Sequence, residues 1–288
     1  MGTAKDIVLR PISAAEGNAV VRRVHYSGKV VNNSQLHIGV FLGGKLEGAM
    51  QFGPSLDKRK LQGLVEGTGW NEFIELNRMA FSEALPRNSE SRAISIAMRM
   101  LRKHAPHLKW VVSFADGAQC GDGTIYRASG FVLTSIKENK SILELPDGYR
   151  FSDLTVNAQG AKGGARVKAE VQRRICTATL TKGNHILNTG AASLKPYLDA
   201  GAKYVPGFQL RYVYFLDPSS RERLTVPTLS FSEIDRRGAG MYLGKPRVST
   251  DAPSPGVTLR EQGAESGAPG DQPGGGGASP TCSLQSFQ

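Results

Sequence analysis

The chain has 288 residues, a formal net charge of +11 and 40% hydrophobic residues. This length fits one ordinary domain with additions, or two small domains. No stretch approaches the roughly 18 apolar residues of a membrane-spanning helix, and residues 1–10 lack the basic-then-apolar pattern of a signal peptide. We therefore expect a soluble cytoplasmic protein with no membrane partner. The three cysteines, Cys120, Cys176 and Cys282, have no metal-site or disulfide spacing, and we expect thiols.

The positive charge is unevenly distributed. From Pro246 onward acidic side chains outnumber basic ones, so the excess lies in residues 1–245. A basic domain favours a polyanionic partner, because Lys and Arg that neutralise phosphates release counterions. Composition does not separate DNA from RNA, and a merely solvated basic surface is the alternative. Residues 246–288 are rich in Gly, Pro, Ser and Ala and are expected to form a disordered tail.

Residues 1–148 have the pattern of a compact α/β unit, the predicted catalytic core. In its first half we expect a strand at 7–11, an amphipathic helix at 14–24 and a loop through Asn32-Asn33-Ser34. Two apolar runs at 36–42 and 46–52, joined by Gly43-Gly44, indicate a hairpin. A further strand is expected within 70–80.

The second half begins with the clearest helical periodicity in the chain, at Ala93, Ile94, Ala97, Met100 and Leu101. Asn88 or Ser89 is suited to cap this helix, and Pro106 marks its end. A buried strand at 110–114, a Gly-rich loop and a short helix at 124–128 follow. Strands at 131–136 and 142–145 are expected to complete this unit.

Residues 149–245 are predicted to combine a basic arm with further α/β elements. The arm, 149–185, is flexible around Gly160 to Gly164 and could order on a phosphate backbone. Its candidate DNA-binding residues are Lys162, Arg166, Lys168, Arg173 and Arg174. After the arm the sequence is again rich in apolar residues, and we expect a helix at 194–200 and a strand at 208–216. The strand is expected to complete the core sheet.

The start of the long helix is a candidate anion site, because backbone N–H groups at a helix N-terminus favour negative charge. Arg87, Ser89, Ser91 and Arg92 are the candidate cofactor-binding residues there. The same position in acetyltransferases of the GNAT fold is a basic, glycine-rich turn that holds a pyrophosphate. Here the glycines are missing, and an ordinary capped helix is the simpler alternative.

Two further positions are candidate catalytic residues. The segment from Thr124 to Phe131 resembles the end of the GNAT fold, in which a tyrosine, here Tyr126, points into the cofactor cleft and acts as a general acid. Asp116 follows a buried strand at the sheet edge where α/β proteins bind ligands. The alternatives are packing for Tyr126 and turn capping for Asp116.

Long motifs combine these positions into one resemblance. They are His25-Tyr26-Ser27, the segment from Asn32 to His37, Glu75-Leu76-Asn77-Arg78-Met79, the segment from Leu85 to Arg92, and Phe114 through Phe131. Together they resemble the Mom family of DNA-modification proteins of phage Mu-type phages, strongly over residues 20–148 and loosely elsewhere.

The resemblance implies a GNAT-like fold, a mixed central sheet flanked by helices. It also implies conversion of the exocyclic amine of adenine in DNA to its carbamoylmethyl derivative, which protects phage DNA from restriction, in the cytoplasm of a bacterial host. The implied catalytic residues are Arg78, Asp116, Tyr126, Tyr26 and Ser91, and the implied metal ligands are His25, Tyr26 and Asp116. Iron and acetyl-coenzyme A or a related donor are the implied cofactors.

The expected partner is double-stranded DNA with a flipped adenine, because the amine is paired inside a duplex. We expect Tyr26 or Tyr126 to contact the base, Arg78 to hold an anion, and Asp116 to manage a proton or metal. A carbamoylmethyl group attaches through its CH2 carbon, so ordinary acyl transfer does not give this product. The alternatives are an amine or protein N-acetyltransferase and a non-enzymatic DNA-binding protein, and a homodimer is one assembly left open.

Overall fold

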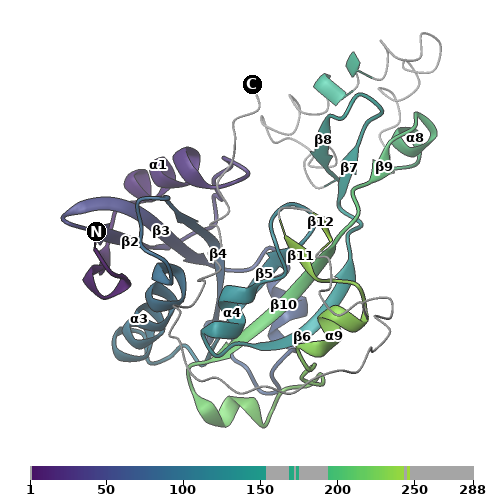
Figure 1. The fold of residues 1–288 in the computed structure, drawn as a ribbon. Coiled ribbons are helices and arrows are strands. Elements are labelled where there is room, and N and C mark those ends of the chain that lie inside the picture. Colours follow the sequence, from purple (N-terminus) through teal and green to yellow (C-terminus); the bar gives the residue numbers. More distant parts are fainter. Residues whose placement is uncertain (1, 154–168, 172, 175–193, 243–244, 247–288) are drawn as a thin grey trace, which may run out of the picture. The chain divides into compact units, whose positions relative to one another are not determined.

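A computed structural model describes residues 2–153, 169–171, 173–174, 194–242 and 245–246 (Figure 1). Within this part of the chain, no helix combines the length and apolar character needed to cross a membrane. The described residues divide into two compact units, 2–56 with 75–107 and 57–74 with 108–246. Cys120 is a thiol, as expected, whereas Cys176 and Cys282 lie outside the described residues, as do Lys162, Arg166, Lys168 and the predicted tail from 247.

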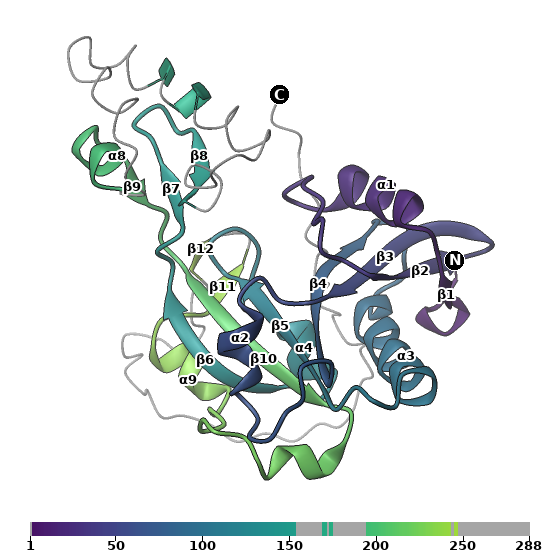
Figure 2. The same cartoon turned by 180° about the vertical axis from the view of Figure 1, so that it is seen from behind.

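Antiparallel strands and two helices build the first unit. Its elements are η1 (Ala4–Asp6), β1 (Val8–Pro11), α1 (Ala14–Val24), β2 (Leu36–Leu42), β3 (Lys45–Gly53), most of β4 (Phe73–Phe81) and α3 (Ser89–His104). β1 pairs with β2, β2 with β3, and β3 with β4. Both views draw α1 on one side of these strands and α3 on the other (Figures 1 and 2). The predicted hairpin and both predicted helices are confirmed.

Local sequence explains why α1 begins and packs as it does. The Ser13 hydroxyl accepts the Glu16 N–H at 3.2 Å, and the Glu16 carboxylate accepts the Ser13 N–H at 2.8 Å. This reciprocal capping box satisfies N–H groups that a helix start otherwise leaves open. Val20 and Val21 then pack against Ala49 and Ala80 of the sheet. The loop that leaves α1 is therefore held close to β3 and β4.

The second unit is larger, and its described strands belong to three sheets. Its helices are α2 (Lys58–Gln62), α4 (Thr124–Ala128), α8 (Lys195–Asp199), η2 (Pro218–Arg221) and α9 (Ser232–Arg236). Its strands are β5 (Trp110–Asp116), β6 (Val132–Glu138), β7 (Ile142–Glu144), β8 (Arg150–Ser152), β9 (Lys203–Tyr204), β10 (Phe208–Phe215), β11 (Met241–Tyr242) and β12 (Lys245–Pro246). The three sheets are the core sheet with β5, β10 and β6, a three-stranded sheet and the two-stranded pair of β11 and β12. β10 lies between β5 and β6 and pairs antiparallel with both, which confirms that the 208–216 strand completes a core sheet.

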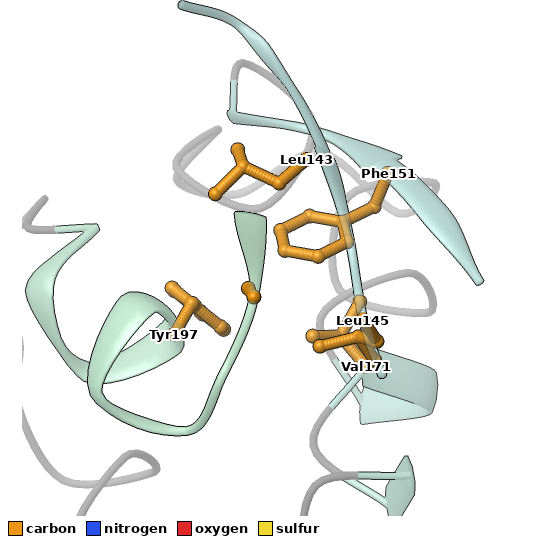
Figure 3. Close-up of a cluster of buried hydrophobic side chains, with 6 residues drawn as sticks. Leu143, Leu145, Phe151, Val171 and Tyr197 are labelled. Atoms are coloured by element: carbon orange, nitrogen blue, oxygen red, sulfur yellow. The ribbon is translucent and has the colours of Figure 1, made fainter. Parts of the chain in front are cut away.

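The short strand β7 does not belong to that core sheet, so the expectation for 142–145 is wrong. β7 pairs with β8 and β9 in a separate three-stranded sheet. A hydrophobic cluster of its own stabilises this sheet, with Leu143, Phe151 and Tyr197 pointing toward one another (Figure 3). β7 pairs outside the core sheet because its apolar side chains pack into this second hydrophobic cluster. We call residues 139–207 the insertion, since they separate the paired strands β6 and β10.

The α/β fold class, a large sheet with flanking helices, is confirmed. The predicted domain boundaries at 148 and 245 stay predictions.

Candidate functional site

The first unit gathers polar side chains where the loop after α1 meets β3 and β4. His25 caps the C-terminal end of α1, and its backbone N–H donates to the Val21 carbonyl at 3.0 Å. The imidazole is only 8% exposed. Its Nδ1 accepts the Ser27 N–H at 3.2 Å and lies 2.9 Å from the Ser27 hydroxyl. Because Nδ1 is an acceptor, the ring proton of neutral His25 sits on Nε2.

The environment keeps this imidazole neutral. Burial, together with the smaller effect of the positive charge of Arg78, lowers the pKa of His25 to about 3. The Tyr26 ring lies 4.3 Å from the imidazole, centroid to centroid, at an interplanar angle of 31°. His25 and Tyr26 are thus brought together, as the sequence predicted. A neutral imidazole is suited to donate a hydrogen bond from Nε2 and unsuited to supply a positive charge.

Arg78 lies on β4 beside a β-bulge. Opposite this bulge, Gln51 pairs with Arg78 and Phe52 with Leu76, so Asn77 is the extra residue. Bulges re-aim side chains and are common next to active sites. The guanidinium donates from Nε to the Lys29 carbonyl at 3.2 Å and from one terminal nitrogen to the Asn77 carbonyl at 2.9 Å. Arg78 therefore ties the loop after α1 to the bulge, and its second terminal nitrogen makes no hydrogen bond to the part of the chain that the structure describes.

Glu75 belongs to the same cluster, and sequence reasoning did not select it. Burial raises the pKa of its carboxyl, while the neighbouring polar side chains of Ser55 and Asn77 and the charge of Arg78 lower it. Asn77 also accepts the Ser34 hydroxyl at 3.2 Å. The available signal was its place in the motif two residues before Asn77, on the strand that carries Arg78.

Close approach of the backbone makes this cluster compact. A Cβ on Gly53 would lie 2.2 Å from the Asn33 carbonyl oxygen and 2.8 Å from the Asn77 side-chain oxygen. Only glycine fits there without moving the loop. The Gln35 N–H then donates to the Phe52 carbonyl at 2.7 Å, which fastens the same loop to β3.

The start of α3 differs from the predicted capped helix. Asn88 adopts a left-handed conformation, with φ of 68°, and its side chain makes no capping bond. Ser89 is buried and donates to the Pro86 carbonyl at 2.6 Å, so it does not cap the helix either. Ser91 donates to the Asn88 carbonyl at 3.2 Å. Both predicted hydroxyls are thus bonded within their own turn.

An acidic side chain occupies this helix start. The Glu90 carboxyl accepts its own backbone N–H, and burial raises its pKa. Among the flanking cations, Arg87 is exposed, whereas Arg92 donates to the Lys5 carbonyl at 3.4 Å. A pyrophosphate bound here would have to displace or neutralise the Glu90 carboxylate.

In the second unit, Tyr126 lies on α4 with its ring buried among aromatic side chains. The ring centroids of Phe131 and Tyr212 lie 5.3 Å and 5.2 Å away. Its hydroxyl accepts the Ser113 hydroxyl at 2.8 Å. The residue is 7% exposed, so its surroundings fit packing as well as chemistry.

Asp122 anchors α4, and sequence reasoning did not give it a role. Its carboxylate is 1% exposed and pairs with Arg127 at 3.2 Å. It also accepts the Thr124 hydroxyl at 3.1 Å. Gly123, with φ of 80°, lets the chain turn directly into the helix.

Asp116 ends β5 and holds the next turn together. One carboxylate oxygen accepts the Ala118 N–H at 3.1 Å, and the other accepts the Gln119 side-chain amide at 2.7 Å. This is the turn-capping arrangement that the sequence left open as an alternative. Within the described residues, no three His, Cys, Asp or Glu side chains come together as a metal-ligand group. The predicted ligand set of His25, Tyr26 and Asp116 includes a tyrosine and stays a prediction.

The described residues of the basic arm are ion-paired. Arg173 contacts Glu170 at 2.8 Å, and Arg174 contacts both Glu170 at 2.6 Å and Asp147 at 2.9 Å. The Arg174 guanidinium also lies 4.3 Å from the centroid of the Tyr149 ring. Arg174 therefore helps to build the insertion, while Arg173, with 64% of its side chain exposed, faces solvent.

The strands and flanking helices define a protein of the α/β class. The family model of the Mom protein family matches residues 6–233. The chain is also 34% identical, over 224 residues, to "Methylcarbamoylase mom" of Escherichia phage Mu, which covers 77% of this chain and 80% of that protein. The chain belongs to the Mom protein family.

Solved structures are more distant. A spermidine/spermine N-acetyltransferase from Vibrio cholerae is 8% identical, with coverage of 77% of this chain and 99% of that chain and a TM-score of 0.39. A GNAT-family acetyltransferase from Elizabethkingia anophelis with acetyl-CoA bound is 15% identical, with coverage of 47% and 82% and a TM-score of 0.31. Similarities at this level carry no argument about the ligand or chemistry of this chain.

Proposed function

We propose that the chain is a DNA-modification enzyme that converts the exocyclic amine of adenine to its carbamoylmethyl derivative. The observation that carries this proposal is the 34% identity to the phage Mu methylcarbamoylase, together with the family match over residues 6–233. The modification protects phage DNA from restriction inside the bacterial cytoplasm. The basic charge of the chain supports a DNA substrate.

The reaction places demands on the protein that its side chains are suited to meet. The adenine amine is a weak nucleophile whose lone pair is delocalised into the ring, and in a duplex it faces thymine, so the base is flipped out. Forming the N–CH2 bond breaks the bond between that carbon and the leaving group of the donor. The amine loses one proton, which balances the proton that the leaving group takes up. We propose that Tyr26 contacts the flipped base and that neutral His25 donates a hydrogen bond from Nε2 to it.

Arg78 is the proposed anion-binding group. Its guanidinium is held by the Lys29 and Asn77 carbonyls, which fixes its direction without neutralising its charge. A cation that is fixed in this way stabilises negative charge that develops on a donor or leaving group. Tyr126 is the proposed proton donor to the leaving group, and Ser91 a proposed auxiliary hydroxyl.

The donor and the metal stay predictions. An acetyl-coenzyme A-like donor would meet Arg87, Ser89, Ser91 and Arg92 at the start of α3, where Glu90 competes for the same N–H groups. Iron would supply activation of the CH2 carbon, and no step above depends on it. Metal analysis of purified protein, beside titration with coenzyme A and Glu90→Gln as a tighter-binding variant, tests both.

Mass spectrometry of nucleosides from a bacterium that expresses the chain tests the proposed function. We expect an adenine nucleoside with the mass of the carbamoylmethyl derivative, and DNA that resists restriction enzymes whose sites contain adenine. An inactive Arg78→Ala chain, expressed equally, is the control. Unmodified adenine beside soluble, intact protein would contradict the proposal, whereas an N-acetylated nucleoside or protein would favour an acetyltransferase. Light scattering of the same protein decides whether it is a homodimer.

A further inference from the structure

The second unit exposes a tryptophan beside α2. The chain has two tryptophans. Trp110 is fully buried in the core, whereas Trp70 is 49% exposed. An indole carries a large apolar surface, and tryptophan is enriched at interfaces with partners. Trp70 is not one of the predicted site residues and does not lie in the basic arm, so neither explains why its indole is exposed.

Neighbouring side chains hold this indole in place. The Lys58 ammonium lies 4.5 Å from the centroid of the Trp70 ring and 5.6 Å from that of Phe73. It also contacts the Asn71 side-chain oxygen at 3.5 Å. Phe73 in turn stacks on Trp110, with 4.4 Å between centroids and an interplanar angle of 7°. Trp70 is therefore anchored through Lys58 to the hydrophobic core, which reduces the entropy lost when a partner binds.

The charges around Trp70 favour a phosphate-bearing partner. α2 begins with Lys58-Arg59-Lys60, and it lies in the foreground of Figure 2. Asp57 pairs with Lys60 at 2.6 Å. Within the described residues, neither Lys58 nor Arg59 has an ion-pair partner. Protein interfaces are depleted in lysine, whereas a fixed aromatic ring beside basic side chains is the usual surface for unpaired bases.

We propose that Trp70 stacks on an unpaired DNA base while Lys58 and Arg59 neutralise the neighbouring phosphates. This inference rests on the proposed function, because flipping an adenine leaves bases unpaired or unstacked around it. Stacking on an aromatic side chain tolerates any base and would hold the opened strand during the reaction. The contact is additional to the predicted contact of the basic arm.

Intrinsic fluorescence of the full chain tests the stacking directly. Only Trp70 is open to solvent, so acrylamide quenching and the longer-wavelength emission report on it rather than on Trp110. We expect a single-stranded oligonucleotide, and a duplex with one mismatched adenine, to quench this emission and protect it from acrylamide. Trp70→Phe should lose the signal and keep most of the affinity, while Trp70→Ala should weaken binding about tenfold.

A charge variant separates stacking from attraction to phosphate. Arg59→Ala should lower the slope of log affinity against log salt concentration by about one unit. Arg99→Ala, which removes an equally exposed arginine from α3, is the matched control and should leave the slope unchanged. Circular dichroism of each variant establishes that it is folded.

Two outcomes overturn the inference. One is DNA that binds without changing the accessibility of Trp70, with Trp70→Ala binding as the wild type does. The other is shielding of Trp70 that depends on protein concentration in the absence of DNA, which would assign this surface to a second copy of the chain. A wild-type chain that leaves adenine unmodified removes the proposed function instead, and nucleoside analysis reports that result separately.

Discussion

The cluster around His25 and Arg78 and the surroundings of Tyr126 use polar groups in different ways. In the first, burial and a neighbouring cation depress the pKa of an imidazole, and a guanidinium near the Glu75 carboxyl donates hydrogen bonds to two backbone carbonyls. In the second, a buried carboxylate is matched by Arg127. The Tyr126 hydroxyl is bonded to Ser113. The difference teaches that an ion pair fixes the charged groups of the second region, whereas hydrogen bonds to carbonyls fix Arg78 in the first. The ion pair favours a rigid surrounding for Tyr126.

Loss of Arg78 should have the largest effect. Arg78→Ala removes a fixed cation, and we expect adenine modification to fall roughly 100- to 1000-fold, as when a preorganised donor is lost. Arg78→Lys keeps the positive charge but lacks the planar guanidinium with its fixed N–H donors, so it should recover only part of the activity. Quantitative nucleoside mass spectrometry measures both. Normal modification by folded Arg78→Ala would remove the proposed contrast between the two regions.

His25 should make stability depend on pH. Its pKa in the folded chain, about 3, is below the unfolded value of roughly 6.5. The stabilisation is therefore complete above about pH 6.5 and is lost as pH falls toward 3, at up to roughly 1.4 kcal/mol per pH unit. Urea unfolding of the wild type and His25→Gln measures the difference. Equal pH dependence in both would show that the imidazole is not kept neutral.

Gly123 tests whether the Tyr126 region is rigid. A Cβ there would lie 2.6 Å from the Tyr212 ring and 2.9 Å from the Tyr126 ring, in a backbone with φ of 80°. We expect Gly123→Ala to lower the free energy of unfolding by about 2 kcal/mol. Gly43→Ala also has a positive φ but meets nothing within 4 Å, so it isolates the backbone cost, about 1 kcal/mol. Equal losses in thermal unfolding would argue for a loose region.

Asp116 should show the smallest effect. Both carboxylate oxygens already hold its own turn, so Asp116→Asn should cost about 1 kcal/mol of stability. We expect modification to change less than about tenfold, which would place Asp116 with the rigid region. A loss as large as that of Arg78→Ala, at unchanged stability, would instead return Asp116 to the chemistry as a proton carrier.

Periodicity and turn residues predicted most of the fold, because they act locally. The helix 14–24 follows directly from its apolar spacing and the Ser13 cap, and the hairpin from Gly43-Gly44. The sequence did not show which of two sheets a strand would join when its residues suit both. The apolar residues of 142–145 suit either sheet, and only the second core around Phe151 and Tyr197 decides between them.

The sequence predicted several individual residues of the candidate site, but it did not predict how they are arranged in space. The motif around Arg78 was found, whereas the bulge at Asn77 depends on the register of β3 against β4. Glu75 and Asp122 gain importance from burial, which a sequence motif does not show. The Glu90 carboxylate at the start of α3 was hidden for the same reason.

The insertion has a consequence for how such chains diversify. Glu138 and Phe208 are direct neighbours across β6 and β10, and the Asn139 N–H donates to the Gly207 carbonyl at 2.8 Å. The chain thus leaves the core sheet after Glu138 and rejoins it at the neighbouring Phe208, and the residues in between have a separate hydrophobic core. A two-residue Asn-Gly turn could bridge that point. We therefore expect that the insertion can be removed, or exchanged between relatives, while β6 and β10 stay paired.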